Sequence, residues 1–280
     1  MFRKHSILFC FISLALHPIS GQETRVMSYN VKYDNVNDTI NNWNNRKHTM
    51  VDLIQYYKPD FVGAQEVLHH QLSYLDSMLA EHSYVGVGRD DGKQKGEYAP
   101  ILFNTFNFEL LENETFWLSE TPAKVSVGWD ASMERICTYG LFKNRTTGME
   151  LYVFNTHFDH IGELARAKSA ELILQKIHDI NVKNLPVILM GDLNLTPDTT
   201  PIKLIRTKMD DGMEISKEPF YGPSGTFSGF DHSRVLNTRI DYIFTKNLKV
   251  NSYIHIDDRM ENNKHVSDHL PVFLTLNTKQ

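Results

Sequence analysis

The feature that most constrains this chain is Leu185–Asn194, an apolar run that ends in Gly-Asp-Leu-Asn. Val187 to Met190 has the length and side-chain branching of a strand buried on both faces. Gly191 lets the backbone turn or lets another group approach closely. Asp192 and Asn194 should then leave the strand end on the same side, because side chains alternate with period two. A carboxylate beside an amide suits a hard cation or a phosphate oxygen, although Asp-x-Asn is also common turn chemistry.

The remaining chain alternates strand-like and helix-like segments. At 280 residues and 41% hydrophobic, it can bury a large core. Apolar residues recur at helical spacing over 43–57, 70–80 and 161–180. Strands are expected at 25–33, 61–67, 84–88, 226–227, 240–244, 249–255 and 271–276, with 99–103 paired to 106–116 and a hairpin over 136–144 and 150–156. The charged, glycine-rich segment 90–96 predicts a mobile loop. No repeat or linker interrupts this pattern, so we expect one domain over 22–280.

Residues 1–21 have the three-part pattern of a secretory signal peptide. Arg3 and Lys4 precede an apolar run from Ile7 to Leu16, and the small residues near Gly21 favour cleavage. The apolar run is too short to span a bilayer stably, so no transmembrane anchor is expected. We therefore predict a secreted or periplasmic protein that acts as a monomer.

Charge and cysteine content limit the classes of substrate and the cellular compartments that fit this protein. Loss of 1–21 removes two basic and no acidic residues, which changes the formal net charge from −5 to −7. A mildly acidic protein without a basic stripe is a poor general binder of polyanions, although nucleic acid stays a possible substrate. Cys10 leaves with the signal peptide, so Cys137 has no internal disulfide partner. An exported protein without disulfides fits a bacterial host better than an animal secretory pathway.

Polar residues recur within or just after the predicted strands, and each alone has an ordinary structural explanation. Asp241 is the most informative, because it interrupts the apolar run Ile240–Phe244. An unpaired carboxylate is costly to bury, so Asp241 needs a cationic or donor partner. A histidine is the natural candidate, since an Asp–His pair holds the ring tautomer and raises its basicity, as a general base requires. The full set is Asn30, Glu66, His157, Asp159, Asp192, Asn194, Asp241, Asp268 and His269.

This set resembles the endonuclease/exonuclease/phosphatase superfamily, which has the deoxyribonuclease-I-like fold. The resemblance covers essentially the whole mature chain, with the motifs in the family order. They are Asn30, Gln65-Glu66, Thr156-His157, Gly191-Asp192-Leu193-Asn194, Asp241-Tyr242 and Ser267-Asp268-His269. Arg135 with Thr138, and Pro223 to Phe227, look closest to a bacterial secreted branch near the deadenylase-like members related to nocturnin.

The resemblance implies an α/β fold in which two packed mixed sheets and flanking helices form a four-layer α/β/β/α sandwich. It also implies one or two Mg²⁺ or Mn²⁺ ions, which prefer oxygen ligands. Glu66 would be the principal metal ligand, with Asn30 beside it and Asp268 completing the metal or histidine shell.

The resemblance also implies roles in catalysis. His269, oriented by Asp241, would be the base on the attacking water. Asp192 would position that water or bind a second metal. Asn194 and His157 would bind phosphate oxygens. Independently of the resemblance, Arg135 either adds a charged donor to phosphate or is a surface or strand-pairing arginine, and Asp159 either takes part in the site or only caps the following helix.

Substrate choice stays open among three readings. The first is an exported phosphodiesterase acting on nucleic acid, nucleotide or phospholipid head groups. The second uses the same site on phosphate monoesters such as inositol or sugar phosphates. The third is a catalytically silent binding module, against which the costly clustered carboxylates argue. Four aromatic residues would either stack on a substrate or pack their loops, namely Trp43, Tyr98, Trp117 and Trp129.

Overall fold

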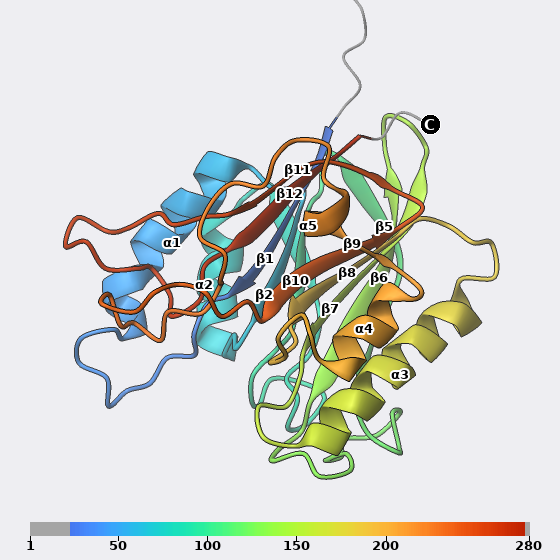
Figure 1. Ribbon diagram of the computed structural model, residues 1–280, viewed down its shortest axis with the longest axis horizontal. Helices are drawn as coiled ribbons and strands as arrows, with labels where there is room; N and C mark the ends of the chain where they lie inside the picture. The colour runs from blue at the N-terminus through green and yellow to red at the C-terminus, as the bar shows by residue number, and fades with distance from the viewer. Residues whose placement is uncertain (1–22, 278–280) are drawn as a thin grey trace, which may run out of the picture.

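The computed structural model describes residues 23–277, and the predicted signal peptide lies outside this range. Within these residues, two sheets of six strands pack face to face (Figure 1). The first sheet has the order β11-β12-β1-β2-β4-β3, with β1 (Glu23–Asn30), β2 (Phe61–Gln65), β3 (His82–Val85), β4 (Ile101–Asn104), β11 (Lys249–His255) and β12 (Val272–Asn277). The second has the order β5-β6-β7-β8-β10-β9, with β5 (Phe108–Trp117), β6 (Ile136–Asn144), β7 (Glu150–His157), β8 (Val187–Asp192), β9 (Asp210–Asp211) and β10 (Asp241–Lys246).

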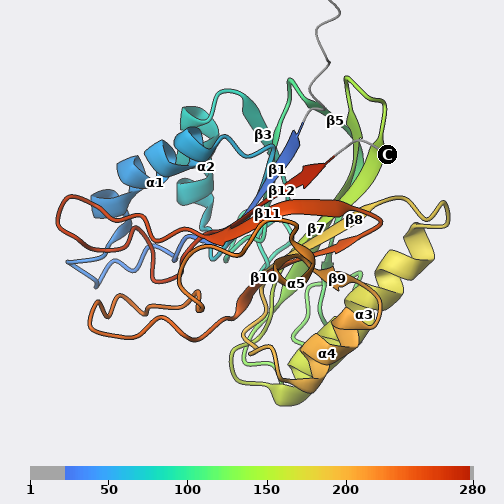
Figure 2. The same cartoon turned by 45° about the horizontal axis from the view of Figure 1, so that its top comes forward.

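Helices cover the outer face of each sheet. The helices are α1 (Trp43–Tyr57), α2 (His69–Met78), α3 (Glu163–Ile180), α4 (Thr200–Arg206) and the short α5 (Gly212–Ile215). Figures 1 and 2 show α1 and α2 on one side of the paired sheets and α3 and α4 side by side on the other. The predicted four-layer α/β/β/α sandwich is therefore confirmed. No helix in the range 23–277 has the length and apolar character needed to cross a membrane.

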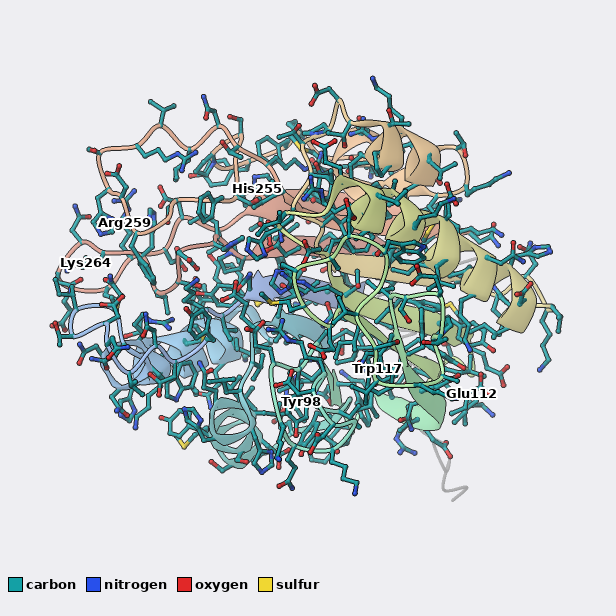
Figure 3. All side chains as sticks on the ribbon, turned by 90° about the horizontal axis from the view of Figure 1, so that it is seen from below. Tyr98, Glu112, Trp117, His255, Arg259 and Lys264 are labelled. Atoms are coloured by element: carbon teal, nitrogen blue, oxygen red, sulfur yellow. The ribbon has the colours of Figure 1, made fainter. Side chains whose placement is uncertain are left out.

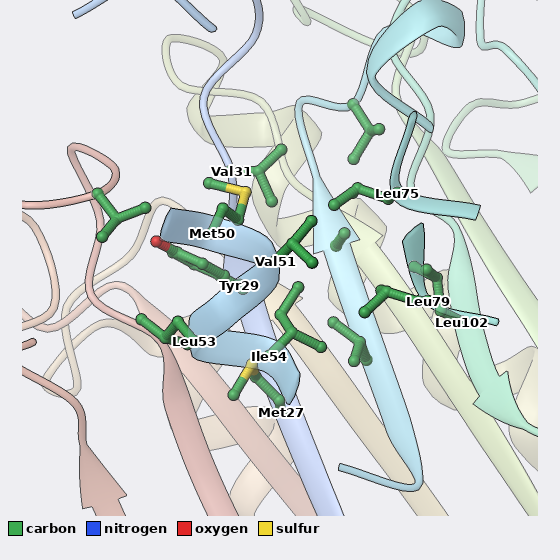
Figure 4. Packing of buried hydrophobic residues seen from close by; sticks show 14 of the residues in the cluster. Met27, Tyr29, Val31, Met50, Val51, Leu53, Ile54, Leu75, Leu79 and Leu102 are labelled. Carbon is green, nitrogen blue, oxygen red and sulfur yellow. The ribbon is translucent and has the colours of Figure 1, made fainter. Parts of the chain in front are cut away.

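The apolar residues that recur at helical spacing in the sequence form the packing surface of α1. Met50, Leu53 and Ile54 are buried against the first sheet, where they belong to the same cluster as Met27 of β1 (Figure 4). The helix ends at Tyr57 and is capped by Lys58, whose backbone is left-handed, and Pro59 follows. Residues three and four apart share one face of a helix, so this spacing buries one side and exposes the other.

Strand β8 is buried on both faces, as its composition predicted. Val187 and Leu189 point to the layer of α3 and α4, whereas Ile188 and Met190 point to the core between the sheets. All six residues of β8 are buried. A strand in this position has no solvent face, so it contains no alternating polar residue until it ends at Asp192.

Two strand predictions were wrong. Segments 99–103 and 106–116 do not pair with each other. β4 lies between β2 and β3 in the first sheet, whereas β5 pairs with β6 in the second. The short connection crosses the sandwich, and Phe108 of β5 packs against Phe61 of β2 with ring centroids 4.5 Å apart. Residues 226–227 form no strand; Phe227 makes an isolated bridge to His269. The hairpin of β6 and β7 is confirmed.

Candidate active site

The polar strand ends meet at one edge of the two sheets. β1 runs parallel to β2, and β7 runs parallel to β8, so the carboxyl ends of each pair lie together. β10 runs antiparallel to β8 with Asp241 opposite Asp192, which brings the start of β10 to the same edge. A cleft of about 510 Å³ opens there, and its walls include Glu66, His157 and Asn194.

The stretch that follows β8 is both a turn and part of this cleft. Asp192 Oδ1 accepts a hydrogen bond of 2.9 Å from the Asn194 backbone N, which is Asx-turn geometry. Asn194 has φ 50°, so the strand does not continue to it and the period-two argument fails after Asp192. The turn instead brings Asn194 Nδ2 within 3.2 Å of His157 Nε2. Gly191 has φ 150°, and a side chain there would collide with the Thr156 carbonyl oxygen of β7.

The other carboxylate oxygen of Asp192 lies at the centre of the cluster. Asp192 Oδ2 accepts a hydrogen bond of 3.0 Å from Asn30 Nδ2, and it lies 3.5 Å from His157 Nε2 and 3.7 Å from His269 Nε2. Burial and the nearby Asp241 charge raise the pKa of Asp192, although His269 opposes this. Burial lowers the pKa of His157 well below its ordinary value, and nearby arginines add to the effect. His157 is therefore neutral and acts through hydrogen bonds.

Asp241 and His269 form the predicted carboxylate–histidine pair. Asp241 Oδ2 lies 2.9 Å from His269 Nδ1, and both side chains are buried. Burial by itself would lower the pKa of His269, but Asp241 and then Asp192 outweigh it and raise the pKa to about 10. Donor atoms of Asp192, Asp241 and His269 lie within 4.8 Å of one another. Because His269 Nδ1 is already held by Asp241, this trio suits a shared proton better than a metal ion.

A second pair of carboxylates converges on one cationic position. Lys32 Nζ lies 3.4 Å from Glu66 Oε2 and 3.3 Å from Asp268 Oδ2. Burial disfavours the ammonium charge, but Asp268 and Glu66 raise the pKa of Lys32 overall. Glu66 and Lys32 have left-handed backbones, with φ 59° and 60°, which is strain of the kind that collects at functional sites. The sequence analysis did not identify Lys32, since a lysine after a strand is usually a solvated side chain.

This chemistry fits a hard divalent cation. Glu66 and Asp268 supply carboxylate oxygens that already face a positive charge, and Asp192 lies across Asn30 from Glu66. Asn30 lies beside Glu66, as predicted, and its amide contacts both carboxylates. Its Oδ1 accepts from the Lys32 backbone N, and its Nδ2 donates to Glu66 Oε1 at 3.1 Å. Asn30 therefore orients the two carboxylates, and metal ligation by its oxygen would require the amide to turn over.

The far wall of the cleft is made by charged side chains, two of which the sequence analysis missed. Arg89 donates to both Glu97 oxygens, with Nη1 at 2.8 Å and Nη2 at 3.0 Å. These residues flank segment 90–96, which was expected to be a mobile loop. Backbone bonds join Arg89 to Glu97 and Asp90 to Lys95, so the segment is an ordered turn. Its glycine and charge content predicted a loop, and nothing in that pattern marked its two ends as cleft residues.

Arg135 reaches the cleft from the residue before β6 and is nearly buried. Its Nε lies 3.3 Å from Asp159 Oδ2, and its Nη2 lies 2.9 Å from His160 Nδ1. The alternative of a surface arginine is therefore wrong. Asp159 Oδ1 accepts from the backbone N of Ile161 and Gly162, so Asp159 organises the turn into α3 while it also holds Arg135.

Three of the four aromatic residues considered for stacking pack their loops instead. Trp43, Tyr98 and Trp117 are buried, and Tyr98 and Trp117 are labelled in Figure 3. The Trp117 indole donates to the Arg89 carbonyl oxygen at 2.8 Å. Trp129 is half-buried and does not line the cleft. The aromatic rings that do line the cleft are Tyr33 and Phe227, beside Lys32 and His269.

Comparison with known proteins agrees with this geometry. The chain is similar to a Bacteroides vulgatus endonuclease/exonuclease/phosphatase of known structure, with 38% identity, 92% of this chain and 100% of that chain covered, and a TM-score of 0.86. It is also similar to a Bacteroides thetaiotaomicron mannosyl-6-phosphatase, with 37% identity, 90% and 99% covered, and a TM-score of 0.87. A probable RNA exonuclease of Saccharomyces cerevisiae is 27% identical over 57% of this chain and 33% of that protein.

The model of the endonuclease/exonuclease/phosphatase family matches residues 27–269. This range runs from β1 to His269 and includes every predicted site residue. With the shared fold and the similarity to the Bacteroides proteins, the match shows that the chain belongs to the endonuclease/exonuclease/phosphatase family.

Proposed function

We propose that this protein is a hydrolase of sugar-phosphate monoesters that depends on Mg²⁺ or Mn²⁺. The observation that carries the chemistry is the meeting of Asp192 and the Asp241–His269 pair with the Glu66–Asp268 carboxylates in one cleft. Membership of the family supports phosphoester hydrolysis in general. The substrate class draws on the similarity to the mannosyl-6-phosphatase, which extends over 90% of this chain.

The reaction follows from the positions of the polar groups. A bound divalent cation, held by Glu66 and Asp268 with Asp192 nearby, would neutralise charge on the phosphoryl oxygens. Water attacks phosphorus, and its proton passes to the Asp192–His269 pair, in which Asp192 Oδ2 and His269 Nε2 lie 3.7 Å apart. Asp241 and Asp192 raise the pKa of His269, and burial together with Asp241 raises the pKa of Asp192, so we assign the proton from water to Asp192 within the pair. The sequence analysis had assigned this role to His269 alone.

Hydrogen-bond donors beside the pair stabilise the reacting phosphate. Asn194 Nδ2 and the neutral His157 ring face the same side of the cleft as Asp192. Turned from their present partners, an N–H of Asn194 and an N–H of His157 would bind phosphoryl oxygens as negative charge grows on them. The bond from phosphorus to the ester oxygen breaks, and that oxygen takes up the proton held by the Asp192–His269 pair and leaves as the sugar hydroxyl. Asn194 Nδ2 lies 3.1 Å from the Phe158 carbonyl oxygen and 3.2 Å from His157 Nε2, so both side chains lie beside the reacting groups before a substrate binds.

Two observations favour a small monoester over a nucleic acid, which is one of the phosphodiester substrates in the first reading of the sequence. The four aromatic residues considered for base stacking are buried or lie outside the cleft, and the two rings that do line it, Tyr33 and Phe227, already contact Lys32 and His269. The cleft also balances its basic groups with carboxylates and has no basic stripe to follow a polymer backbone. A phosphodiester stays the second candidate, because a probable RNA exonuclease is among the relatives.

Steady-state assays with Mg²⁺ and Mn²⁺ test the proposal. We expect kcat/KM to be at least about 10-fold higher for mannose 6-phosphate and p-nitrophenyl phosphate than for bis-p-nitrophenyl phosphate or single-stranded RNA. EDTA and Asp192→Asn should each abolish turnover. Preference for the diesters would favour the second candidate. Absence of any EDTA-sensitive turnover would favour a silent binding module.

We also propose that the protein acts outside the cytoplasm as a monomer. The basic start and apolar run within 1–21 support export. Fractionation of the native host, followed by N-terminal sequencing, should find a mature chain beginning near Gln22 in the periplasm or medium. A full-length cytoplasmic product would contradict this.

A further inference from the structure

The imidazole of His157 divides the cleft into two ends. Its Nε2 lies 3.5 Å from Asp192 Oδ2, at the end where the phosphate would react. Its Nδ1 lies 4.0 Å from Glu97 Oε2, at the other end. The two ring nitrogens point in different directions, so Glu97 and Asp192 flank the ring. Arg89 and Arg135 complete the far end, beside the place where the leaving group of a phosphate held at the Asp192 end would lie.

The far end is rich in charged groups but has no net charge. Arg89 is neutralised by Glu97 through two parallel hydrogen bonds, and Arg135 is neutralised by Asp159. A second phosphate would need an excess of positive charge there, which this pairing removes. Sugar hydroxyls both donate and accept hydrogen bonds, so a neutral set of guanidinium donors and carboxylate acceptors suits them.

These groups are held in place before any substrate arrives. The Arg89 side chain is 12% exposed, and its backbone carbonyl is fixed by the Trp117 indole. Arg135 is fixed by Asp159 and His160. Met133 Sδ lies 3.1 Å from Arg89 Nη2 and adds a less polar surface beside the guanidinium. Preorganised planar groups lose little side-chain freedom on binding, which favours discrimination among similar leaving groups.

We propose that Arg89, Glu97 and Arg135 form the pocket that recognises the hydroxyl groups of the sugar leaving group. This inference rests on the proposed function, because it assigns the specificity of the same cleft. The three residues bind the part of the substrate that departs and take no part in proton transfer. They determine which phosphate monoester is preferred.

The test compares two substrates on each protein. Mannose 6-phosphate carries the hydroxyl groups, and p-nitrophenyl phosphate lacks them. The measured quantity is the ratio of their kcat/KM values, which does not depend on the fraction of folded enzyme. We expect this ratio to fall at least 10-fold in Glu97→Gln and in Arg135→Lys, mainly through a higher KM for the sugar phosphate. A ratio within twofold of wild type in both variants would overturn the proposal.

A matched control and a binding experiment separate the possible failures. Glu109 pairs with Arg145 at 3.7 Å on the exposed surface, so Glu109→Gln should keep the wild-type ratio. A wild-type enzyme that hydrolyses p-nitrophenyl phosphate but no hexose 6-phosphate would overturn the pocket and leave phosphoester hydrolysis standing. If neither ester is hydrolysed, the proposed function fails. Calorimetry of mannose 6-phosphate then tests the pocket directly: at least fivefold weaker binding to Glu97→Gln supports it, and equal affinity overturns it.

Discussion

Replacing Asp241 by asparagine removes one charge while keeping the shape of the side chain. In the wild type, the Asp241 carboxylate lies 2.9 Å from His269 Nδ1 and is the main cause of the raised pKa of that histidine. The asparagine oxygen can still accept the Nδ1 hydrogen bond, so the ring should keep its orientation. The ring pKa, however, should fall toward its ordinary value of 6.5.

The size of the effect follows from linkage. Because the pKa of folded His269 lies above that of the unfolded chain, its stabilisation is complete below pH 6.5 and disappears as the pH rises towards 10. At about 1.4 kcal/mol per pKa unit, the full difference corresponds to at most about 5 kcal/mol. Coulomb attraction with an effective dielectric constant near 20 gives about 4 kcal/mol for such a close pair. Between pH 7 and 10, we therefore expect the free energy of unfolding of the wild type to fall by about 3 kcal/mol more than that of Asp241→Asn.

Urea unfolding followed by tryptophan fluorescence at pH 7, 8, 9 and 10, in EDTA, measures this difference. A ¹H–¹³C NMR titration of the His269 ring supplies an independent reading of its pKa. Groups remote from Asp241 titrate alike in both proteins and cancel in the comparison. Asp192 does not cancel, because the Asp241 charge also raises its pKa, to about 7, at the lower end of this pH range. Parallel stability curves together with an unchanged ring titration would refute the argument that Asp241 controls the charge of His269.

Three other substitutions test the remaining parts of the site. His269→Ala should lower kcat at least about 100-fold and also reduce stability, because Asp241 loses its partner; near-normal kcat would remove His269 from the proton-transfer pair. Glu66→Gln should weaken Mg²⁺ or Mn²⁺ binding, measured by calorimetry, by about 10-fold or more, and an unchanged isotherm would exclude it as a ligand. Gly191→Ala should lower the free energy of unfolding by about 2 kcal/mol in urea titrations, because its methyl group would meet the Thr156 carbonyl oxygen. An unchanged midpoint would contradict that reading.

The layers of the fold could be predicted because the apolar residues that recur at helix or strand spacing are the residues that the structure buries. The spacing of Met50, Leu53 and Ile54 predicted α1, and the apolar composition of Val187 to Met190 predicted a strand buried on both faces. The pairing of β4 and β5 could not be predicted. A short connection is compatible with a hairpin in one sheet and with a crossing between sheets, and only the packing of distant rings such as Phe61 on Phe108 distinguishes them.

The residues of the proton-transfer group could also be predicted from the sequence, because Asp192 ends a strand, Asp241 begins one and His269 closely precedes one. Asp241 needed a buried partner, and His269 is that partner. Lys32, Arg89 and Glu97 were missed because they lie in loops, where charged residues are usually solvated. Their burial depends on what the loops pack against, such as the Trp117 indole beneath Arg89.

The sequence alone determined which residues stand at the ends of buried strands, since burial on two faces leaves polar side chains only where a strand stops. It also indicated that Asp192 belongs either to a turn or to a site. Tertiary structure decided that Asp192 belongs to both. One oxygen closes the Asx turn with Asn194, and the other faces Asn30, His157 and His269. Those three residues come from strands and loops far apart in the chain, so only the packing of the two sheets could bring them to one carboxylate.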